Sequence, residues 1–309
     1  MNVVILEPIH SSGVAALANS CRVHQLTGQD DPRLTEVMAT ADALIVRSTR
    51  IGADLIELGP RLKVIGRHGA GTDNIDLQVT KDRGITVVNT PRSNTDSVAE
   101  YVITVALMML KRIPSVSEQL RSGAFDPSRG SLPGQVDRAG LSGRDANGCR
   151  LGIIGAGAIG RAVASRAQAL GMTVVAYDPY ITTLDGIELV AELPDLLRQA
   201  DIVSLHVPGG NGHLIDAEQL SLMQQGAMLV NAARGDLVDP IALAAALSSG
   251  HIAAAAVDVW EPEPPALDHP LLAAPNLIAT PHMAAMTHEA LRRMSEDVAA
   301  NVIRALTDH

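Results

Sequence analysis

Short runs of β-branched and aliphatic residues recur along this chain, and stretches with the spacing of an amphipathic helix lie between them. In the first part of the chain, strands are predicted at 3–6, 22–25, 43–46, 62–65 and 86–88, with helices such as 12–18 and 32–41 between them. Strands that alternate with helices are typical of a parallel sheet covered by helices. This part of the chain is therefore predicted to form a flavodoxin-like α/β domain.

The same alternation starts again at residue 151. Strands are predicted at 151–154, 173–177, 202–205, 227–230, 253–257 and 277–279, and helices at 159–170, 193–198, 216–223 and 240–248. Six strands in this arrangement predict a Rossmann-type doubly wound parallel sheet, which binds its ligand at the carboxyl ends of the strands. The predicted fold class is α/β with two domains.

Between these parts, residues 98–112 have helical spacing, and the middle of this helix is apolar on every side. Such a helix must be buried all round, and we expect it to lie both between domains and in a subunit contact. Pro114 is predicted to end this helix, and a second helix is predicted at 116–122. Residues 125–150 are rich in Gly, Ser, Pro, Asp and Arg and are predicted to form a long irregular loop, either flexible or held by a partner surface.

A last helix, 287–306, has no strand of its own and is expected to return to the first domain. The first domain would then be discontinuous. The predicted boundaries are 1–95 with 284–309 for the first domain, and 96–283 for the second.

Composition excludes several classes of protein. Of the 309 residues, 47% are hydrophobic and 19% are charged, as in a soluble globular protein. The formal net charge of −10 gives no basic surface for nucleic acid, so no nucleic-acid partner is expected. An anionic substrate would have to be attracted by local cationic side chains.

The two cysteines, Cys21 and Cys149, cannot form a disulfide framework and match no metal motif. Both are interpreted as free thiols in a reducing compartment, and no metal is expected. The N-terminal apolar run ends at Glu7 without a basic region before it, so it predicts a strand and not a signal peptide. The longest apolar segment, 101–110, is too short to span a bilayer. No membrane association is expected, and the predicted location is the cytoplasm.

The most informative motif follows the strand at 151–154. Gly155 can take sharp backbone angles, Gly157 lets a pyrophosphate approach the main chain, and Gly160 allows close packing of the helix on the strand. Glycines at this spacing also occur in ordinary loops. Because a strand precedes them and a helix follows, the motif predicts a dinucleotide-binding site.

The next predicted strand, 173–177, ends in Asp178. A carboxylate at this position can accept hydrogen bonds from the ribose hydroxyls of adenosine and would repel a 2′-phosphate. Asp178 followed by Pro179 could instead form only a turn. With the glycine motif before it, Asp178 favours NAD over NADP as the cofactor.

Three polar residues stand shortly after apolar strands of the second half: Arg234, Glu263 and His282. Singly, each has a structural explanation: Arg234 could cap a turn, Glu263 could be a solvated charge, and His282 could be a loop histidine with its hydrogen bonds satisfied. Their joint spacing, together with the segment 66–76, resembles the D-isomer-specific 2-hydroxyacid dehydrogenase family over essentially the whole chain.

The resemblance implies a chemistry that suits these residue types. Oxidation of a 2-hydroxy acid needs a base for the hydroxyl proton, and His282 supplies it. Glu263 would bind the far imidazole nitrogen, fix the tautomer and favour the imidazolium. The planar guanidinium of Arg234 would hold the substrate carboxylate and polarise the carbonyl.

The resemblance also implies the contacts with the ligands. Asp258 would orient the nicotinamide amide, and the backbone N–H groups of 68–71 would bind the substrate carboxylate. The implied cofactor contacts are Gly155, Gly157, Ala158, Ile159, Gly160, Asp178, His206, Val207, Pro208, Ala232, Asp258 and Thr95. The implied substrate contacts are Arg47, Ser48, His68, Gly69, Ala70 and Gly71. On this basis 96–283 is the expected NAD-binding Rossmann domain, and 1–95 with 284–309 is the expected substrate (catalytic) domain.

Arg47, Arg50 and Arg67 make the first domain resemble the phosphoglycerate dehydrogenase branch. The expected partner is thus a small anionic D-2-hydroxy or 2-oxo acid with a second anionic group, phosphate or sulfonate. One or two of these arginines could instead form surface ion pairs. Glyoxylate or hydroxypyruvate reduction, and a sulfolactate-type dehydrogenase, stay open as alternatives.

Two rival interpretations involve other families. Formate dehydrogenases share this architecture but have Gln where this chain has Glu263. A non-catalytic NAD-sensing scaffold, resembling the C-terminal-binding corepressors, would keep the fold and the three residues. A homodimer is expected from the apolar helix at 98–112 and from the family.

Overall fold

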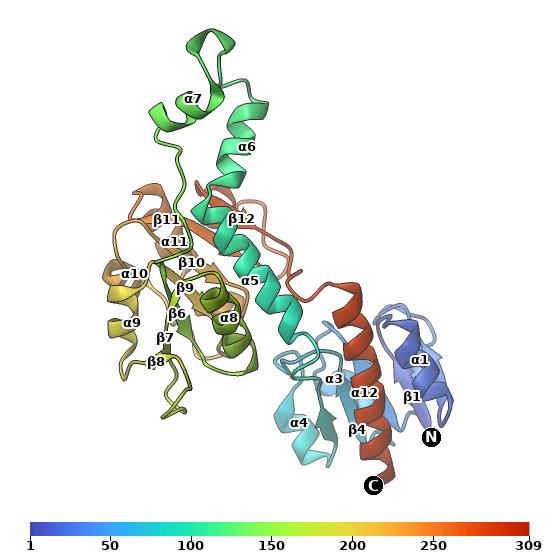
Figure 1. The fold of residues 1–309 in the computed structure, drawn as a ribbon. Coiled ribbons are helices and arrows are strands. Elements are labelled where there is room, and N and C mark those ends of the chain that lie inside the picture. The colour runs from blue at the N-terminus through green and yellow to red at the C-terminus, as the bar shows by residue number, and fades with distance from the viewer. Residues whose placement is uncertain (309) are drawn as a thin grey trace. The chain divides into compact units, whose positions relative to one another are not determined.

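The computed structural model describes residues 1–308; His309, the last residue of the predicted first domain, lies outside this range. The chain divides into two compact units. Unit 1 is Met1–Ser97 with the segment that starts at Ala285, and unit 2 is Val98–Ala284. Both are α/β (Figure 1). None of the helices within the described range combines the length and the apolar content needed to cross a membrane.

Unit 1 is built on a parallel sheet. Its described strands are β1 (Asn2–Ile5), β2 (Arg22–Gln25), β3 (Ala43–Val46), β4 (Val64–Arg67) and β5 (Thr86–Val88), in the order β2-β1-β3-β4-β5. This order is that of flavodoxin-like folds, as predicted. Only β4 departs by two residues from its predicted range, since the N–H of Leu62 closes a turn onto the carbonyl of Gly59.

Helices cover both faces of this sheet. They are α1 (Ser11–Ala18), α2 (Leu34–Met38), α3 (Ala53–Glu57), α4 (Leu77–Asp82) and α12 (His288–Asp308). The last helix, α12, packs against α1, β4 and β5. The packing is close: a Cβ at Gly13 would lie 2.5 Å from the carbonyl oxygen of Ser295, and one at Gly66 would lie 2.5 Å from Cγ2 of Val302. The C-terminal helix thus completes the core of unit 1.

Unit 2 is built on a larger parallel sheet. Its described strands are β6 (Arg150–Ile154), β7 (Thr173–Tyr177), β8 (Glu188–Leu189), β9 (Ile202–Leu205), β10 (Ala227–Asn231), β11 (Ile252–Val257) and β12 (Leu277–Ala279), in the order β12-β11-β10-β9-β6-β7-β8. The strand order reverses between β6 and β9, as in the predicted Rossmann-type sheet. Strand β8 was not predicted, because two residues carry no readable periodicity.

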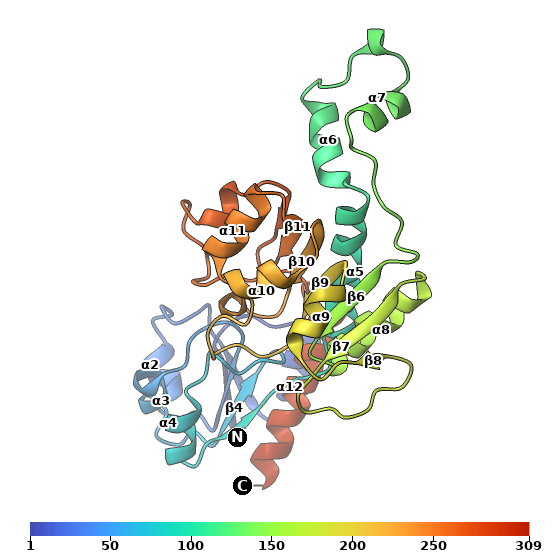
Figure 2. The ribbon, with the colours of Figure 1, turned by 90° about the vertical axis from the view of Figure 1, so that its left-hand side faces the viewer.

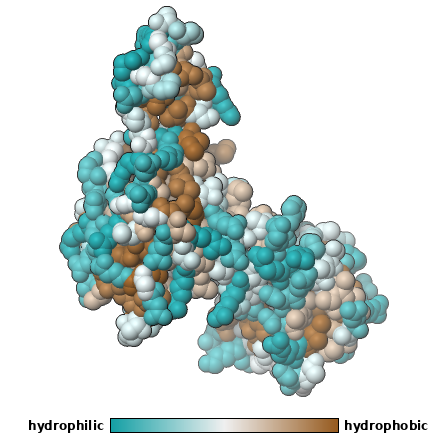
Figure 3. Space-filling model, viewed as in Figure 1, coloured by the Kyte–Doolittle hydropathy of each residue, from teal (hydrophilic) through white to brown (hydrophobic). Residues whose placement is uncertain are grey.

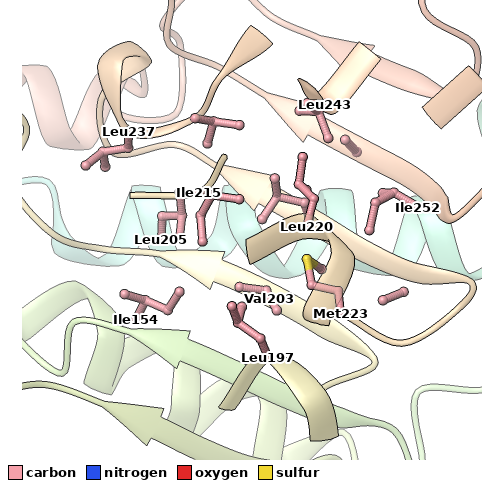
Figure 4. Packing of buried hydrophobic residues seen from close by; sticks show 14 of the residues in the cluster. Ile154, Leu197, Val203, Leu205, Ile215, Leu220, Met223, Leu237, Leu243 and Ile252 are labelled. Carbon is pink, nitrogen blue, oxygen red and sulfur yellow. The ribbon is translucent and has the colours of Figure 1, made fainter. Parts of the chain in front are cut away.

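The helices of unit 2 include α8 (Ala158–Ala169), α9 (Leu193–Gln199), α10 (Ala217–Leu222) and α11 (Pro240–Ser248), with 3-10 turns η2 (Gly235–Leu237) and η3 (Pro270–Ala273). Figure 4 shows how Val203 and Leu205 of β9 pack with Leu220 and Leu243 from the helices. This core fixes the strands whose ends carry the predicted site.

Unit 2 also carries a projection. After α5 (Thr95–Leu110), the chain turns at Arg112, which has a φ of 53°, into α6 (Ile113–Arg121), so Pro114 lies in the first turn of α6 and does not simply end α5. Figures 1 and 2 show α6 and the following segment extending beyond the sheet. We call residues 113–140 the arm.

The prediction of an irregular loop at 125–150 was wrong in part. This stretch contains η1 (Pro127–Arg129) and α7 (Leu132–Arg138). The tip is organised by Gln135, which accepts the N–H of Asp126 at 2.9 Å and donates to the carbonyls of Asp126 and Gly130 at 2.8 and 2.9 Å. Polar hydrogen bonds of this kind leave no apolar period in the sequence, which is why the pattern failed here.

The arm has almost no core of its own. None of the residues of α6 is buried, and the side chains of Ile113, Leu120 and Leu132 are 51%, 56% and 52% exposed. Figure 3 shows hydrophobic surface on this projection and at its base. On α5, Ile103 and Leu107 are only half-buried, so a single copy of the chain does not cover every side of that helix, and the predicted subunit contact stays a prediction.

Candidate active site

The C-terminal ends of three neighbouring strands carry the predicted catalytic residues. Arg234 follows β10, Glu263 lies in the segment after β11, and His282 follows β12. These strands are adjacent and parallel, so the segments that follow them leave the same edge of the sheet. Doubly wound folds bind ligands at this edge.

Glu263 and His282 form a hydrogen-bonded pair. Nδ1 of His282 lies 2.8 Å from Oε2 and 3.1 Å from Oε1 of Glu263, and Oε1 also accepts the N–H of Trp260 at 2.9 Å. Because Nδ1–H is bound to the carboxylate, Nε2 is the nitrogen left for a ligand. Partial burial alone would raise the pKa of the Glu263 carboxyl, but the hydrogen bonds from His282 and Trp260 and the charge of Arg234 outweigh it and hold that pKa below its ordinary value.

The backbone of His282 is held in an uncommon conformation. Its φ is 53°, in the left-handed region that few residues other than glycine adopt. The carbonyl of Asp258 accepts the N–H of His282 at 2.6 Å, and the Asp258 carboxylate accepts the N–H groups of Met283 and Ala284, each at 2.8 Å. One buried acid therefore fixes three consecutive residues at the site.

Two hydroxyls complete the surroundings of Asp258. Thr280 Oγ1 donates to Asp258 Oδ1 at 2.6 Å, and Tyr101 OH donates to Thr280 Oγ1 at 2.6 Å. Burial raises the pKa of Tyr101 to about 12, so this phenol stays protonated at neutral pH. Asp258 is 0% exposed. Its carboxylate positions the His282 turn, and its Oδ2, which accepts a single N–H here, has a further lone pair, so the expected contact with a nicotinamide amide stays a prediction.

Arg234 sits on a turn fixed by a buried side chain. Asn231, at the end of β10, is 1% exposed; its Nδ2 donates to the Arg234 carbonyl at 2.7 Å, and its Oδ1 accepts the N–H of Ala233 at 3.1 Å. A Cβ at Gly235 would lie only 2.3 Å from the carbonyl carbon of Trp260. The Arg234 turn therefore packs directly on the segment that carries Glu263, and the guanidinium charge acts on that carboxylate.

The glycine motif forms a tight turn between β6 and α8. Gly155 has a φ of 95°, and a Cβ there would lie 2.6 Å from the carbonyl oxygen of His206; one at Gly160 would lie 2.2 Å from that of Gly155. Gly157 caps α8, and a Cβ at this position would meet no atom within 4 Å. Ala158 and Ile159 open the helix, whose first N–H groups have no acceptor inside it. Open space in front of these groups fits the pyrophosphate of a dinucleotide.

Asp178 lies just past β7 and ties this turn to the next one. Its Oδ2 accepts the N–H of Ala156 and its Oδ1 that of Tyr180, each at 2.9 Å. The turn role that the sequence left open is therefore present. Each carboxylate oxygen has a further lone pair, so the ribose role is compatible with these bonds.

The other predicted cofactor contacts lie at strand ends or at a helix start. His206 follows β9, with Nε2 3.0 Å from Ser204 Oγ, and burial lowers its pKa to about 4, so it is neutral at pH 7. Val207 and Pro208 come next, and Ala232 directly follows β10. Thr95 opens α5, and within residues 1–308 its buried hydroxyl has no hydrogen-bond partner.

In unit 1, two of the four N–H groups at 68–71, which are predicted to bind the substrate carboxylate, already have main-chain acceptors. The N–H of His68 donates to the Val46 carbonyl at 2.8 Å, and that of Gly69 to the Arg67 carbonyl at 3.0 Å. Among the described residues, only the N–H groups of Ala70 and Gly71 in this segment have no acceptor. The His68 ring is buried, with Nε2 2.9 Å from Ser295 Oγ; desolvation, and then the charge of Arg47, lower its pKa to about 4.

The segment after β3 is also tied down. Both donors of Ser48, its N–H and its hydroxyl, bind the carboxylate of Glu7, so the predicted substrate contact through Ser48 has no donor left. The Arg47 guanidinium donates to the Pro8 carbonyl at 3.0 Å. Neither Arg47 nor Arg50 forms an ion pair with any described residue.

Residues 103–284 match the family model described as "D-isomer specific 2-hydroxyacid dehydrogenase, NAD binding domain". The chain belongs to the D-isomer specific 2-hydroxyacid dehydrogenase family. Unit 2, which contains the glycine turn, is thus the NAD-binding domain of this family.

Similar members of the family have different names. The chain is 39% identical to a D-3-phosphoglycerate dehydrogenase of Methanocaldococcus jannaschii, over 99% of this chain but only 57% of that protein. It is 42% identical to an (S)-sulfolactate dehydrogenase of Chromohalobacter salexigens, over 99% of this chain and 98% of that protein. A solved structure, the TT0316 protein of Thermus thermophilus, has a TM-score of 0.87 and 33% identity, over 100% of this chain and 98% of that one. The chain spans little more than half the length of several D-3-phosphoglycerate dehydrogenases that it matches.

These family members do not support the scaffold interpretation, since the two curated relatives are both named as dehydrogenases. Sequence reasoning about the family site missed Asn231, Thr280, Tyr101 and Trp260. A usable signal existed for Asn231 and Thr280, because each is a polar residue at the end of an apolar strand.

Proposed function

We propose that this protein is an NAD-dependent dehydrogenase that interconverts a small D-2-hydroxy acid and its 2-oxo acid. The observation that carries the proposal is the Glu263–His282 hydrogen bond of 2.8 Å beside the Arg234 turn, at the ligand-binding edge of an NAD-binding domain. NAD, when bound, accepts the hydride that leaves the substrate, or returns it in the reverse direction.

Each member of the catalytic set has a role that its geometry supports. Glu263 binds Nδ1–H of His282, so Nε2 can take the hydroxyl proton of a hydroxy acid and return it to an oxo acid. The carboxylate stabilises the imidazolium formed in the first case. Arg234, whose Nη1 also donates to the Ala233 carbonyl at 2.6 Å, is proposed to bind the substrate carboxylate through its planar guanidinium and to stabilise charge on the carbonyl oxygen. Glu263, where formate dehydrogenases have Gln, favours hydroxy-acid chemistry.

The cofactor is proposed to lie against the glycine turn. The pyrophosphate would bind at the start of α8 over Gly157, and Asp178 would accept the adenosine ribose hydroxyls, which favours NAD over NADP. His206, Val207, Pro208, Ala232 and Thr95 are proposed to complete the site. Unit 1 is proposed as the substrate domain, with the N–H groups of Ala70 and Gly71 as carboxylate donors.

The substrate is proposed to carry a second anionic group, phosphate or sulfonate. Support comes from the Arg47 guanidinium, which has no ion-pair partner among the described residues, and from the names of the two curated relatives. Reduction of glyoxylate or hydroxypyruvate is the second candidate. It would need no such cation.

A substrate panel tests both proposals. Purified protein is mixed with NAD and 3-phosphoglycerate, sulfolactate, glycerate or lactate, and with NADH and the matching 2-oxo acids, while nicotinamide absorbance is followed. Turnover of any 2-hydroxy acid supports the dehydrogenase, and higher kcat/KM for the phosphorylated or sulfonated acid supports the second anion. Absence of turnover across the panel would contradict the proposed activity.

A homodimer is proposed as the working form. The half-buried Ile103 and Leu107 of α5, together with the exposed Ile113 and Leu120 of the arm, are apolar surface that a second copy would cover. Sedimentation that shows a monomer at all concentrations would contradict this.

A cytoplasmic location is also proposed, because both cysteines, Cys21 and Cys149, are free thiols. Burial raises the pKa values of these two thiols, so little reactive thiolate forms at neutral pH.

A further inference from the structure

Unit 1 has a ligand-binding position of its own by topology. In the order β2-β1-β3-β4-β5, the connections reverse between β1 and β3. Doubly wound folds bind ligands in the crevice outside the carboxyl ends of the strands at such a reversal. In this chain Glu7 comes shortly after β1, and 47–49 directly follow β3.

The Glu7 carboxylate fills that position. Its Oε2 accepts the N–H groups of Arg47, Ser48 and Thr49 at 2.8, 3.0 and 3.1 Å, and its Oε1 accepts the hydroxyl of Ser48 at 2.6 Å. Three successive main-chain N–H groups that converge on one oxygen form a cradle for an anion. Partial burial alone would raise the pKa of Glu7, but these hydrogen bonds outweigh it and hold the pKa below its ordinary value, so the group is a carboxylate at neutral pH.

The opposite side of the same segment is fixed by Asn74. Its Nδ2 donates to the carbonyl of Thr49 at 2.7 Å and, more weakly, to that of Arg47 at 3.4 Å. The main chain of Asn74 is itself bound, since its carbonyl accepts the N–H of Ile51 at 2.7 Å. The segment 47–49 is thus held on its N–H side by Glu7 and on its carbonyl side by Asn74, and its main-chain donors are not available to a substrate.

Glu7 does not neutralise the neighbouring guanidinium. The carboxylate takes the main-chain N–H of Arg47, whereas the Arg47 side chain donates to the Pro8 carbonyl at 3.0 Å and lies 3.9 Å from the sulfur of Met286. No ion pair joins Glu7 and Arg47 among the described residues. An acid directly beside an arginine therefore orders the arginine's backbone and leaves its charge uncompensated.

We propose that Glu7 is a built-in anion that occupies the cradle of unit 1 and positions Arg47, so that the second anionic group of the substrate is recognised by the Arg47 side chain and not by the loop amides. Glu7 is a positioning residue in this account. The proposal rests on the proposed function, because it concerns the substrate of that same enzyme.

A double-mutant cycle tests whether Glu7 acts through Arg47. Glu7→Ala and Arg47→Ala should each raise KM for 3-phosphoglycerate by roughly tenfold or more, with kcat changed less than about twofold and with a clearly smaller change in KM for glycerate, which lacks the phosphate. The double variant should lose no more than the worse single variant, because both remove the same contact. Additive losses, or equal losses on both substrates, would overturn the proposal, as would a wild-type enzyme with equal KM for both.

Chemical rescue separates positioning from a general effect on folding. Acetate should enter the emptied cradle of Glu7→Ala, restore its KM for 3-phosphoglycerate and raise its Tm, while chloride at the same ionic strength should do neither. Glu7→Gln serves as the second variant: an amide cannot accept from donors on both sides, so it should show the same substrate-specific loss without rescue. Should Glu7→Ala be too unstable to purify, a Glu7→Gln enzyme with wild-type KM would overturn the proposal.

The Tm measurement distinguishes failure of this proposal from failure of the proposed activity. If the wild-type protein turns over no 2-hydroxy acid, the proposed function fails, and an acetate-specific rise in the Tm of Glu7→Ala still supports the anion cradle. If acetate and chloride change that Tm equally, the cradle is contradicted whatever the activity.

Discussion

The main-chain carbonyl of Asp258 accepts the N–H of His282 at 2.6 Å, and the buried carboxylate of Asp258 accepts the next two N–H groups along the chain. A left-handed backbone at His282 costs free energy unless its surroundings hold it. Asp258 supplies that support from the end of β11, the strand that pairs with β12. The histidine is therefore positioned through its backbone by one acid, Asp258, and through its ring by another, Glu263.

Asp258→Asn should lower kcat more than it lowers cofactor affinity. An amide presents one donor to a site that offers only donors, so a buried N–H loses its acceptor, at a cost of about 1–3 kcal/mol in stability. The displaced His282 turn should reduce kcat roughly 100-fold, which steady-state kinetics would measure. Thr280→Ser, which keeps the hydroxyl on Asp258, is the matched control and should retain near-normal kcat. Wild-type kcat in Asp258→Asn would argue against this support.

Glu263→Gln should weaken catalysis without emptying the NAD site. Gln keeps the shape of the side chain but removes the charge that stabilises the imidazolium. We expect kcat for oxo-acid reduction to fall at least roughly tenfold. A kcat within twofold of the wild type would exclude this role for the carboxylate.

Two glycines of one motif should respond in opposite ways. A Cβ at Gly157 meets no atom within 4 Å, whereas one at Gly160 would lie 2.2 Å from the Gly155 carbonyl oxygen. Gly157→Ala should therefore leave the Tm nearly unchanged and weaken NADH binding roughly tenfold or more, because the methyl group occupies the pyrophosphate position. Gly160→Ala should lower the Tm. Tight NADH binding by Gly157→Ala, measured by fluorescence titration, would contradict the proposed position of the cofactor at this turn.

His68 should make stability fall in mild acid. Its folded pKa is about 4 and the unfolded value is near 6.5, so the unfolded chain binds the extra proton between these pH values. The stability is fully present above pH 6.5, and about 3 kcal/mol is lost as the pH falls toward 4. Urea unfolding at several pH values should show a smaller acid loss in His68→Asn, which has no titrating ring. Equal acid losses in the two proteins would mean that His68 is not buried as a neutral ring.

Most of the strands could be predicted because each is a short apolar run between polar segments. The ranges of β2, β3, β5, β7, β9 and β12 match the predicted ones. The arm could not be predicted in the same way, because α7 is held by the hydrogen bonds of Gln135 and buries little apolar surface. Strand β8 was missed since it exists only through pairing with β7.

The positions of Arg234, Glu263 and His282 could be predicted because parallel strands end at one edge of a sheet. The residues that support them could not, since their partners are main-chain groups that only the folded chain brings near. Asn231, for example, binds the backbone three residues away, whereas Glu7 binds N–H groups forty residues further on. The sequence shows an acid or an amide at these positions but gives no sign of what it accepts.

The most direct test of the catalytic assignment is turnover by His282→Asn, since asparagine tolerates the left-handed backbone found at this position. NADH affinity is measured by fluorescence titration, and oxo-acid reduction by the loss of nicotinamide absorbance, on the same preparation. We predict NADH affinity within about twofold of the wild type and kcat lower by roughly 10²–10⁴-fold. Turnover within a few-fold of the wild type would contradict the account.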